Sequence, residues 1–295
     1  MVRALGTRVI TVFVNPAAGN AADVEAALQK ANHFDVRTVR ADQLRGAVQQ
    51  SIAQGASRIA VAGGDGTVAA AAASIADSDV ELAVIPGGTL NHFAREHGIP
   101  VDPAEACQVA SCGRIRRVDV GWVNDRLFLN TSSVGVYANY VRVRELHERR
   151  VGYWAASLWA IARTFVRFQP FQVSFESDDL QRTYTTPLVF LAVGERELKL
   201  PRLGRRLENG RSGLHVMVVR GHTRARLVAL SLAAAARGIG AVSRTPHLDS
   251  FVVPRCTIEQ RHSTVAVDGE VVTLTSPLKY ELGVGALRLV VPPKA

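Results

Sequence analysis

The sequence predicts an α/β N-terminal domain with a mostly parallel sheet, followed by an antiparallel β-sandwich domain with helical insertions. Before about residue 120, short apolar runs alternate with helical stretches, a rhythm typical of a parallel sheet covered by helices. From about Val118, strand-like runs follow one another across turn residues, as in an antiparallel sandwich. The length of 295 residues suits one large domain or two medium ones. We therefore expect a first domain over residues 1–125 and a second over 126–284.

Most of the expected strands of the first domain are short runs of mainly apolar residues that stop at turn-forming residues. The first ends at Asn15-Pro16, the third at Gly63-Gly64 and the fourth at Pro86-Gly87-Gly88. The four strands are expected at Arg8–Val14, Asp35–Val39, Arg58–Ala62 and Glu81–Ile85. Alanine-rich or otherwise helix-favouring stretches between them predict helices at Ala21–Lys30, Ala41–Gln54 and Thr67–Ile75.

The second domain is predicted from a series of strand-like runs, many of them separated by turn residues. These runs are Arg117–Val123, Arg126–Thr131, Gln172–Glu176, Pro187–Val193, Leu214–Val219, Leu248–Pro254, Thr257–Glu259, Thr264–Val267 and Leu287–Val291. Two helical insertions are expected, around Ala138–Phe168 and Arg224–Arg237. In the first insertion, apolar residues at helical spacing favour a core-facing stripe over a membrane face.

Composition and apolar patterning exclude several classes of protein. Hydrophobic residues make up 47% of the chain, which excludes a disordered chain, and three cysteines are too few for a disulfide-stapled module. The N-terminus lacks the apolar run and cleavage site of a signal peptide. The longest apolar stretches, 153–168 and 227–242, contain arginines and fall short of the roughly 20 apolar residues that a spanning helix needs. We therefore expect a cytoplasmic protein.

The formal net charge of +9 indicates an anionic partner: nucleic acid, an anionic membrane or a phosphorylated small molecule. Basic residues are dense in 142–150 and 196–211, but no nucleic-acid-binding motif accompanies them. Attraction to an anionic membrane and an ordinary solvated basic surface are equally good interpretations. We expect peripheral association with the inner face of the membrane and no nucleic acid partner, and a homodimer is left open.

Three small-residue loops follow the first, third and fourth expected strands, where the carboxyl ends of parallel strands line a ligand crevice. These loops are Asn15–Gly19, Gly63–Thr67 and Pro86–Asn91. Small residues allow close backbone approach, and amides at a helix N-terminus bind phosphate well. One such loop alone is an ordinary tight turn, but three at one edge predict a nucleotide site. Thr67 is either a helix cap or a phosphate contact.

Two other nucleotide-binding folds do not fit. Gly64-x-Gly66-x-x-Ala69 matches a dinucleotide fingerprint, but it follows the third strand rather than the first, and no acid ends the next strand. The chain has no G-x-x-x-x-G-K-[ST], which excludes a P-loop enzyme. Asp65 lies inside the second loop, where an acid repels phosphate unless a cation intervenes. It therefore indicates a Mg²⁺-dependent site.

Taken together, the motifs resemble the diacylglycerol kinase catalytic family, and within it the bacterial lipid kinases related to sphingosine and ceramide kinases. The motifs occur in order along almost the whole chain. They are Asn15-Pro16-x-x-Gly19, Gly63–Thr67 (GGDGT), Pro86–Arg95 (PGGTLNHFAR), Val118–Gly121, Phe128–Asn130, Asp268–Glu270 and Ala286–Pro292. GGDGT alone is shared with NAD kinase and phosphofructokinase, so the resemblance implies a first domain like theirs.

The resemblance implies that ATP binds the α/β domain, that the site lies in the cleft, and that residues from about 285 to 295 return to the first domain. It implies ATP contacts from Asn15, Pro16, Gly19, Gly63, Gly64, Asp65, Gly66, Thr67, Gly88, Thr89 and Asn91. It also implies that Glu270 is the general base, with Asp65 and Asp268 as further catalytic residues. Asp65 and Asp119 would belong to a metal–water network. Taken alone, Glu270 fits an ordinary hairpin, because Asp-Gly marks a type I′ turn.

The chain departs from the family pattern at two places that bear on metal binding. His92 follows the Asn of the third loop, where many relatives carry Asp. Many bacterial relatives hold a structural Mg²⁺ with an Asp-Asp-Gly-x-Leu segment. The matching region here is Leu207–Leu214, where Glu208 is the one nearby carboxylate and hence the candidate ligand.

These observations lead us to expect an ATP- and Mg²⁺-dependent lipid kinase that phosphorylates a lipid hydroxyl, with diacylglycerol giving phosphatidic acid as the first candidate. A sphingoid base, a phosphatidyl lipid or an isoprenoid alcohol is an alternative acceptor. A catalytically silent protein that binds nucleotide or lipid is an alternative of a different class.

Overall fold

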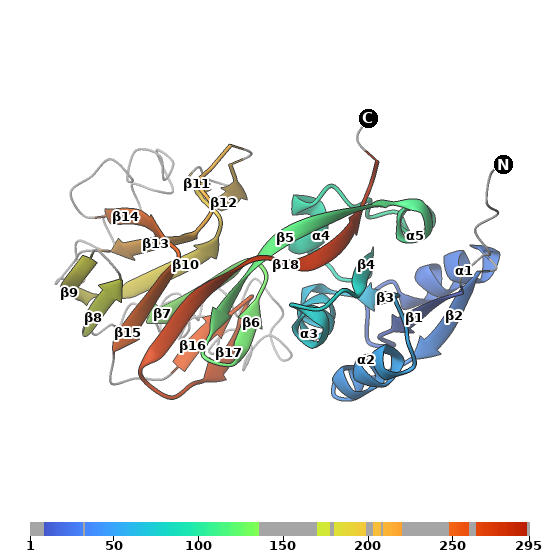
Figure 1. The fold of residues 1–295 in the computed structure, drawn as a ribbon, viewed down its shortest axis with the longest axis horizontal. Coiled ribbons are helices and arrows are strands. Elements are labelled where there is room, and N and C mark those ends of the chain that lie inside the picture. Colours follow the sequence, from blue (N-terminus) through green and yellow to red (C-terminus); the bar gives the residue numbers. More distant parts are fainter. Residues whose placement is uncertain are drawn as a thin grey trace, which may run out of the picture. The chain divides into compact units, whose positions relative to one another are not determined.

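The computed structural model describes residues 9–31, 33–135, 170–177, 180–198, 203–207, 209–219, 248–259 and 264–293. The chain forms two compact units (Figure 1). The first unit contains Met1–Val120 and Val284–Ala295, and the second contains Gly121–Gly283. Both expected helical insertions, Ala138–Phe168 and Arg224–Arg237, lie outside the described residues.

The first unit is a parallel sheet with helices between its strands, as the sequence predicts. Its elements are β1 (Ile10–Val14), α1 (Ala21–Ala31), β2 (Phe34–Thr38), α2 (Leu44–Ala53), β3 (Arg58–Gly63), α3 (Asp65–Ile75), β4 (Glu81–Pro86), α4 (His92–Glu96), α5 (Pro103–Cys112), most of β5 (Arg114–Val123) and the end of β18 (Leu278–Val291). The strand order is β2-β1-β3-β4-β18, and every neighbouring pair is parallel. The expected α/β fold class is confirmed for this unit.

Helices cover both faces of this sheet because its central strands are apolar on both sides. Val12 of β1 and Ala60 of β3 belong to a buried cluster with Val24 of α1 and Ala106 of α5. On α3, Ala71 and Ile75 are also buried, and this helix contacts β3, β4 and α2. Strands buried on both faces read as continuous apolar runs, and this is why the sequence identifies them.

The last strand of the chain joins the first unit beside β4, with Arg288 opposite Glu81. Glu81 accepts hydrogen bonds from Arg58 Nε at 2.8 Å and from Arg288 Nη2 at 3.4 Å. The Arg58 guanidinium also donates to the carbonyls of Ala110 and Ser111. A single carboxylate therefore connects three strands, and its Arg58 partner extends the network to the end of α5.

The second unit consists mainly of antiparallel strands. They are the end of β5, β6 (Arg126–Phe128), β7 (Thr131–Gly135), β8 (Phe171–Ser177), β9 (Leu180–Thr186), β10 (Leu188–Val193), β11 (Arg196–Leu198), β12 (Leu203–Arg206), β13 (Leu214–Val219), β14 (Leu248–Val253), β15 (Arg255–Glu259), β16 (Thr264–Val267), β17 (Glu270–Thr273) and the start of β18. One sheet has the order β14-β13-β10-β7-β16-β17. A second contains β18-β15-β8-β9, and β11 pairs with β12 in a separate ribbon.

The two larger sheets of this unit share one apolar core, so the expected sandwich is confirmed. Phe175 and Ile258 enter the core from one sheet, and Val189 and Val216 enter it from the other. Alternation of inward apolar and outward polar residues, as in β15, is the pattern expected for such sheets. Within the described residues, no helix is long and apolar enough to cross a membrane.

Several elements differ from the sequence-based expectation. The strand expected at 126–131 is two strands, β6 and β7, and the strand expected at 287–291 is the end of the 14-residue β18. Helices α4 and α5 and strands β9, β11, β12 and β17 were not expected. Most of the missed elements are only three to five residues long, too short for a periodic signal to stand out.

Candidate functional site

The three glycine loops of the first unit form one connected assembly at the carboxyl ends of β1, β3 and β4. The backbone amide of Asn15 donates to the carbonyl of Ala62 at 3.0 Å, and the Asn15 side-chain amide donates to Thr67 Oγ1 at 3.0 Å. The amide of Gly87 donates to the carbonyl of Gly63 at 2.8 Å. The structure therefore brings together the loops that the sequence predicts to share an edge.

Two of these loops pack backbone against backbone, and this contact requires glycine. A Cβ on Gly88 would lie 2.6 Å from Gly64 Cα, and a Cβ on Gly87 would lie 3.0 Å from Gly63 Cα. A Cβ on Gly63 would lie 2.6 Å from Thr67 Oγ1. Backbone atoms cannot yield as the far end of a flexible side chain can, so these glycines set the shape of the site.

The third loop is closed by its own asparagine. Asn91 Oδ1 accepts from the Gly88 amide at 2.9 Å, and Asn91 Nδ2 donates to the Gly88 carbonyl at 2.6 Å. Asn91 has the left-handed backbone conformation, with φ of 50°, and only 7% of it is exposed. Asparagine tolerates this conformation better than most residues. Asn91, expected as an ATP contact, therefore holds the loop in shape.

Asp65 of the second loop binds the backbone of the third loop. Its carboxylate oxygens accept from the amides of His92 and Phe93, each at 3.1 Å. These amides open α4, so Asp65 caps this short helix from a distant position in the sequence. An acid inside the glycine loop thus has a structural reason that requires no cation. The His92 side chain, which departs from the family pattern, is exposed.

The N-terminus of α3 has the features of a phosphate site. Its cap residue, Gly64, has no side chain and therefore makes no side-chain cap hydrogen bond to the first-turn amides. These amides have no partner within their own helix and carry the positive end of its dipole. Thr67 is buried and receives the Asn15 hydrogen bond, while Pro16, Gly19, Gly66 and Thr89 are exposed. The residues present therefore fit the phosphate groups of a nucleotide.

Asn20 is a loop residue that the sequence analysis missed. Its Nδ2 donates to the carbonyl of Pro86 at 3.3 Å, which connects the first loop to the third. Its Oδ1 is buried and has no hydrogen-bond partner within the described structure. Buried acceptors are rarely left unpaired, so this oxygen is a candidate for a ligand or water contact. Its position next to Gly19 was the one available signal.

In the second unit, Asp268 organises the backbone around the DGE motif. Its carboxylate accepts from the amides of Leu129, Asn130 and Thr131 at 2.7, 2.8 and 2.9 Å. Asp268 and Gly269 both have positive φ, so they form the two-residue I′-type turn between β16 and β17 that Asp-Gly indicates. Asp268, expected as a catalytic residue, is a clamp on residues 129–131.

Glu270 begins β17, and its carboxylate is accessible. The side chain is 59% exposed, and Oε2 lies 2.8 Å from Nη2 of Arg126. Arg126 belongs to β6 and is 44% exposed. The sequence analysis assigned no role to Arg126, because its partner lies 144 residues away.

No group of three or more potential metal ligands occurs among the residues that the structure describes. Asp119 Oδ1 accepts from the Gly285 amide at 3.0 Å, which fixes β18 beside β5. Glu208 lies outside the described residues. Arg211, three residues further along the sequence, binds the Glu195 carboxylate through its backbone amide and its guanidinium, and this lowers the pKa of Glu195. Mg²⁺ typically combines one or two carboxylates with substrate phosphates and water, so Asp65 remains a candidate ligand.

The basic segment 196–211 is not a uniform charged surface. Arg196 is 6% exposed, and its Nη2 lies 3.4 Å from the carbonyl of Asn130. Its backbone amide donates to Nδ1 of His215, and burial lowers the pKa of this histidine. Arg211 is exposed but paired with Glu195. Lys199 and Arg202 lie outside the described residues.

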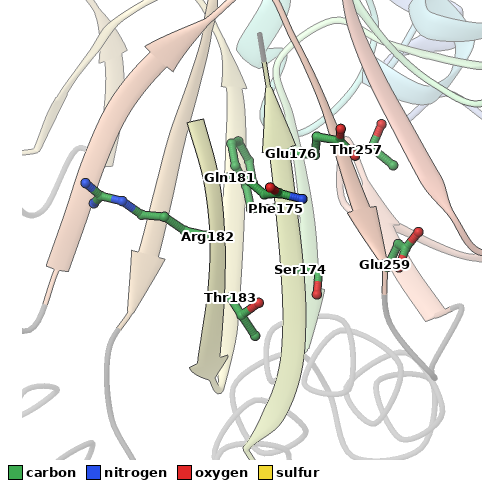
Figure 2. Close-up of a pocket in the computed structure, with 8 residues that line it drawn as sticks. All are labelled: Ser174, Phe175, Glu176, Gln181, Arg182, Thr183, Thr257 and Glu259. Atoms are coloured by element: carbon green, nitrogen blue, oxygen red, sulfur yellow. The ribbon is translucent and has the colours of Figure 1, made fainter. Parts of the chain in front are cut away.

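A hollow of about 300 Å³ lies over β8, β9 and β15, and none of the residues predicted to form the site lines it. Figure 2 shows its lining, which is mostly polar: Ser174, Phe175, Glu176, Gln181, Arg182, Thr183, Thr257 and Glu259. Arg182 points away from the two glutamates and toward Asp249, from which it lies 4.0 Å.

Residues 9–123, which carry all three glycine loops, match the diacylglycerol kinase catalytic domain. The match covers less than half of the chain. The resemblance that the sequence motifs indicate is thereby confirmed. Asp268 and Glu270 lie beyond the matched segment, so their roles rest on the geometry of the second unit and on the resemblance.

Curated relatives match the same part of the chain. A Pseudomonas aeruginosa protein named "Probable lipid kinase YegS-like" is 35% identical over 134 residues, which are 43% of this chain and 44% of the relative. A Mycobacterium tuberculosis diacylglycerol kinase is 33% identical over 125 residues, 39% of this chain and 40% of the relative. The chain thus spans less than half the length of these relatives.

The likeness to solved structures extends over both units. A crystal structure from Bacillus anthracis str. Sterne, of a protein assigned as a diacylglycerol kinase, superposes with a TM-score of 0.72 at 25% identity. The superposition covers 96% of this chain and 97% of that one. The expected fold class, a mostly parallel α/β domain followed by an antiparallel β-sandwich domain, is therefore confirmed.

Proposed function

We propose that this protein is an ATP-dependent kinase that transfers the γ-phosphate to a lipid hydroxyl, with diacylglycerol as the first candidate acceptor and phosphatidic acid as its product. The observation that carries the proposal is the assembly of three interlocked glycine loops around the uncapped N-terminus of α3. The names of the relatives favour a lipid acceptor, since they describe lipid and diacylglycerol kinases.

In this proposal the first unit binds ATP mainly through backbone amides. The amides of Asp65, Gly66 and Thr67 face the phosphates, as expected at a helix N-terminus. Asn15, Pro16, Gly19, Gly63, Gly64, Gly88 and Thr89 shape the loops around the nucleotide. Asn91 acts indirectly by closing the third loop. Positioning of this kind accounts for most of the catalysis in phosphoryl transfer.

Mg²⁺ accompanies ATP in this proposal and supplies charge neutralisation on the phosphates. Asp65 is its candidate protein partner, directly or through water, because a carboxylate oxygen can accept more than one contact. Asp119 and Glu208 are the other candidates: Asp119 Oδ1 accepts the Gly285 amide, and Glu208 lies outside the described residues. Waters and phosphate oxygens would complete the coordination.

Glu270 is the proposed general base. The acceptor oxygen forms the new bond to the γ-phosphorus while the bond from that phosphorus to the β–γ bridging oxygen breaks, and ADP leaves. The hydroxyl proton passes to the Glu270 carboxylate. The high exposure of Glu270 suits contact with a substrate that arrives from solution or from a membrane. A base of this kind contributes roughly 10²–10⁴-fold.

The acceptor is presented at a membrane in this proposal, so the protein would act as a peripheral protein at the inner face. The net charge of +9 supports attraction to anionic lipid. Co-sedimentation with vesicles containing anionic lipid tests this. Binding should weaken as salt rises, because screening reduces the attraction. Vesicle binding that does not change with salt concentration would mean that the basic residues are only a solvated surface.

The central experiment measures transfer of radiolabelled phosphate from ATP with Mg²⁺ to a lipid panel. The panel contains diacylglycerol, a sphingoid base, a phosphatidyl lipid and an isoprenoid alcohol. We expect one class to be labelled, and Glu270→Gln to reduce the rate at least about 100-fold. Full activity of Glu270→Gln would refute the base assignment. No labelling by the wild type would favour a catalytically silent nucleotide- or lipid-binding protein.

A further inference from the structure

We propose that Arg126 is a positioning residue for Glu270. This inference rests on the proposed function, in which Glu270 is the general base. The pair joins Nη2 of Arg126 to Oε2 of Glu270 at 2.8 Å and connects two strands that are far apart in the sequence, β6 and β17. Within the described structure, this contact is the one hydrogen bond or ion pair that the Glu270 carboxylate makes.

An exposed ion pair by itself orders little, because both side chains are long and solvent screens the attraction. The backbone on either side of this pair, however, is held at defined points. Asp268, two residues before Glu270, binds the amides of Leu129, Asn130 and Thr131. This clamp fixes the end of β6 relative to the turn that begins β17.

A second clamp lies on the other side of Arg126. Asn124, with φ of 51°, exchanges two hydrogen bonds with the backbone of Lys279, through its own amide and its Oδ1, each at 2.8 Å. Its Nδ2 donates to the carbonyl of Thr275 at 2.9 Å. Arg126 therefore lies between two fixed points of the backbone. On one side Asp268 binds the amides of residues 129–131, and on the other Asn124 binds Lys279 and Thr275.

Because the backbone is held on both sides of Arg126, the ion pair fixes the orientation of the Glu270 carboxylate. Arg126 holds Oε2, and Oε1 makes no hydrogen bond among the described residues, so Oε1 is left to receive a proton. An unheld glutamate on the surface would rotate about three side-chain bonds. A displacement of about 1 Å at a catalytic group can cost on the order of 10²-fold in rate. The effect of losing Arg126 should therefore fall on kcat.

The test compares Arg126→Met, which keeps an unbranched side chain and removes the charge, with Arg126→Lys. We expect Arg126→Met to lower kcat about 10- to 100-fold while the KM for ATP stays within two-fold. Arg126→Lys should recover part of this loss, because a cation remains. Arg37→Met is the matched control, since Arg37 also pairs at 2.8 Å with a carboxylate, Asp35, and is also 44% exposed.

The double variant Arg126→Met/Glu270→Gln separates positioning from other roles. If Arg126 acts through Glu270, the double variant is no slower than Glu270→Gln alone. Losses that multiply would overturn the inference and indicate direct contact of Arg126 with substrate. An unchanged kcat in Arg126→Met would overturn it as well, as would a loss that disappears when the variants are compared at equal distance below their Tm.

A measurement independent of activity keeps the inference testable if no lipid is phosphorylated. The carboxyl ¹³C resonance of Glu270, assigned by its disappearance in Glu270→Gln, reports on the ion pair in solution. We expect it to shift in Arg126→Met and to stay in place in Arg37→Met. An unmoved resonance in Arg126→Met would overturn the inference. If the wild type labels no lipid of the panel but the Glu270 resonance shifts in Arg126→Met, the proposed kinase activity is overturned. The contact by which Arg126 holds the Glu270 carboxylate would still be established.

Discussion

Asp65 caps the helix that contains Phe93, 28 residues further along the chain, through a carboxylate-to-amide hydrogen bond of 3.1 Å. The same carboxylate accepts from the neighbouring amide of His92. From the sequence, an acid inside a glycine loop indicated a cation. The structure supplies a second reason for an acid at this position, because the opening amides of α4 need an acceptor and these oxygens provide it.

Asp65→Asn tests the cap. The substituted side chain keeps one oxygen acceptor but turns an amide group toward a backbone N–H and loses the charge. We expect the free energy of unfolding to fall by about 1–2 kcal/mol, measured by urea denaturation. Asp23→Asn, in the first turn of α1, is the control and should cost about 0.5 kcal/mol.

The Mg²⁺ concentration that gives half-maximal activity separates the cap from a metal role. If Asp65 acts only as a cap, this concentration is unchanged in Asp65→Asn and only the stability falls. A rise of several-fold in this concentration, with wild-type stability, would contradict the cap as the main role and support the metal interpretation.

Gly88→Ala tests the backbone packing of the second and third loops. The new methyl group would lie 2.6 Å from Gly64 Cα, so one loop must move. We expect a loss of about 1–3 kcal/mol in the free energy of unfolding together with weaker binding of ATP, measured by calorimetry. Gly46→Ala is the control, because Gly46 is exposed in α2 with nothing within 4 Å of the new atom. It should stabilise the protein by about 0.5–1 kcal/mol. Equal effects of the two changes would refute the packing argument.

Glu81→Ala tests the network that binds the last strand to the first unit. Glu81 is 19% exposed and lies between Arg58 and Arg288, which are themselves largely covered. Removing it leaves the Arg58 guanidinium without its carboxylate and Arg288 with the exposed Asp79 alone, so we expect a loss of about 2 kcal/mol in urea denaturation. Asp79→Ala is the control: Asp79 also pairs with Arg288 but is 92% exposed. Its loss should cost less than about 0.5 kcal/mol. A comparable loss in the control would show that partial burial of Glu81 has no special effect.

The parts of the molecule that the sequence predicts well are those with local signals. The central strands of the first unit are buried on both faces, and each reads as an apolar run ended by Gly or Pro. Because parallel strands end at the same edge, the convergence of Asn15, Gly63 and Gly88 could be predicted as well. The Asp-Gly turn before Glu270 follows from the same local reasoning.

The parts that could not be predicted depend on contacts between distant residues. Nothing local distinguishes Asp268 as a clamp, since its three amide partners lie 137 to 139 residues away. This clamp also explains why the run 126–131 divides into two strands, because amides bound to Asp268 cannot serve a continuous ladder. Asn91 and Asp65 were identified by motif, but their hydrogen bonds give them structural roles that the motif did not reveal.

A final prediction concerns the acid side of the stability profile. His215 is 3% exposed, its Nδ1 accepts from the Arg196 amide at 3.0 Å, and its Nε2 lies 2.7 Å from Ser250 Oγ. Burial is the main cause that lowers its pKa; Arg211 and Arg196 add to the effect, and Glu195 opposes it. When the pH falls below the ordinary value of 6.5, the unfolded imidazole gains a proton that the folded one does not. The stabilising contribution is therefore present above pH 6.5 and is lost as the pH falls toward the lowered folded pKa.

His215→Asn keeps an acceptor near the Arg196 amide but does not titrate, so its free energy of unfolding should fall less between pH 7.5 and 5.5 than that of the wild type. Ser250→Ala, which keeps the imidazole, should retain the wild-type pH dependence. Identical slopes for the wild type and His215→Asn in urea denaturation at these pH values would show that His215 is not the group responsible.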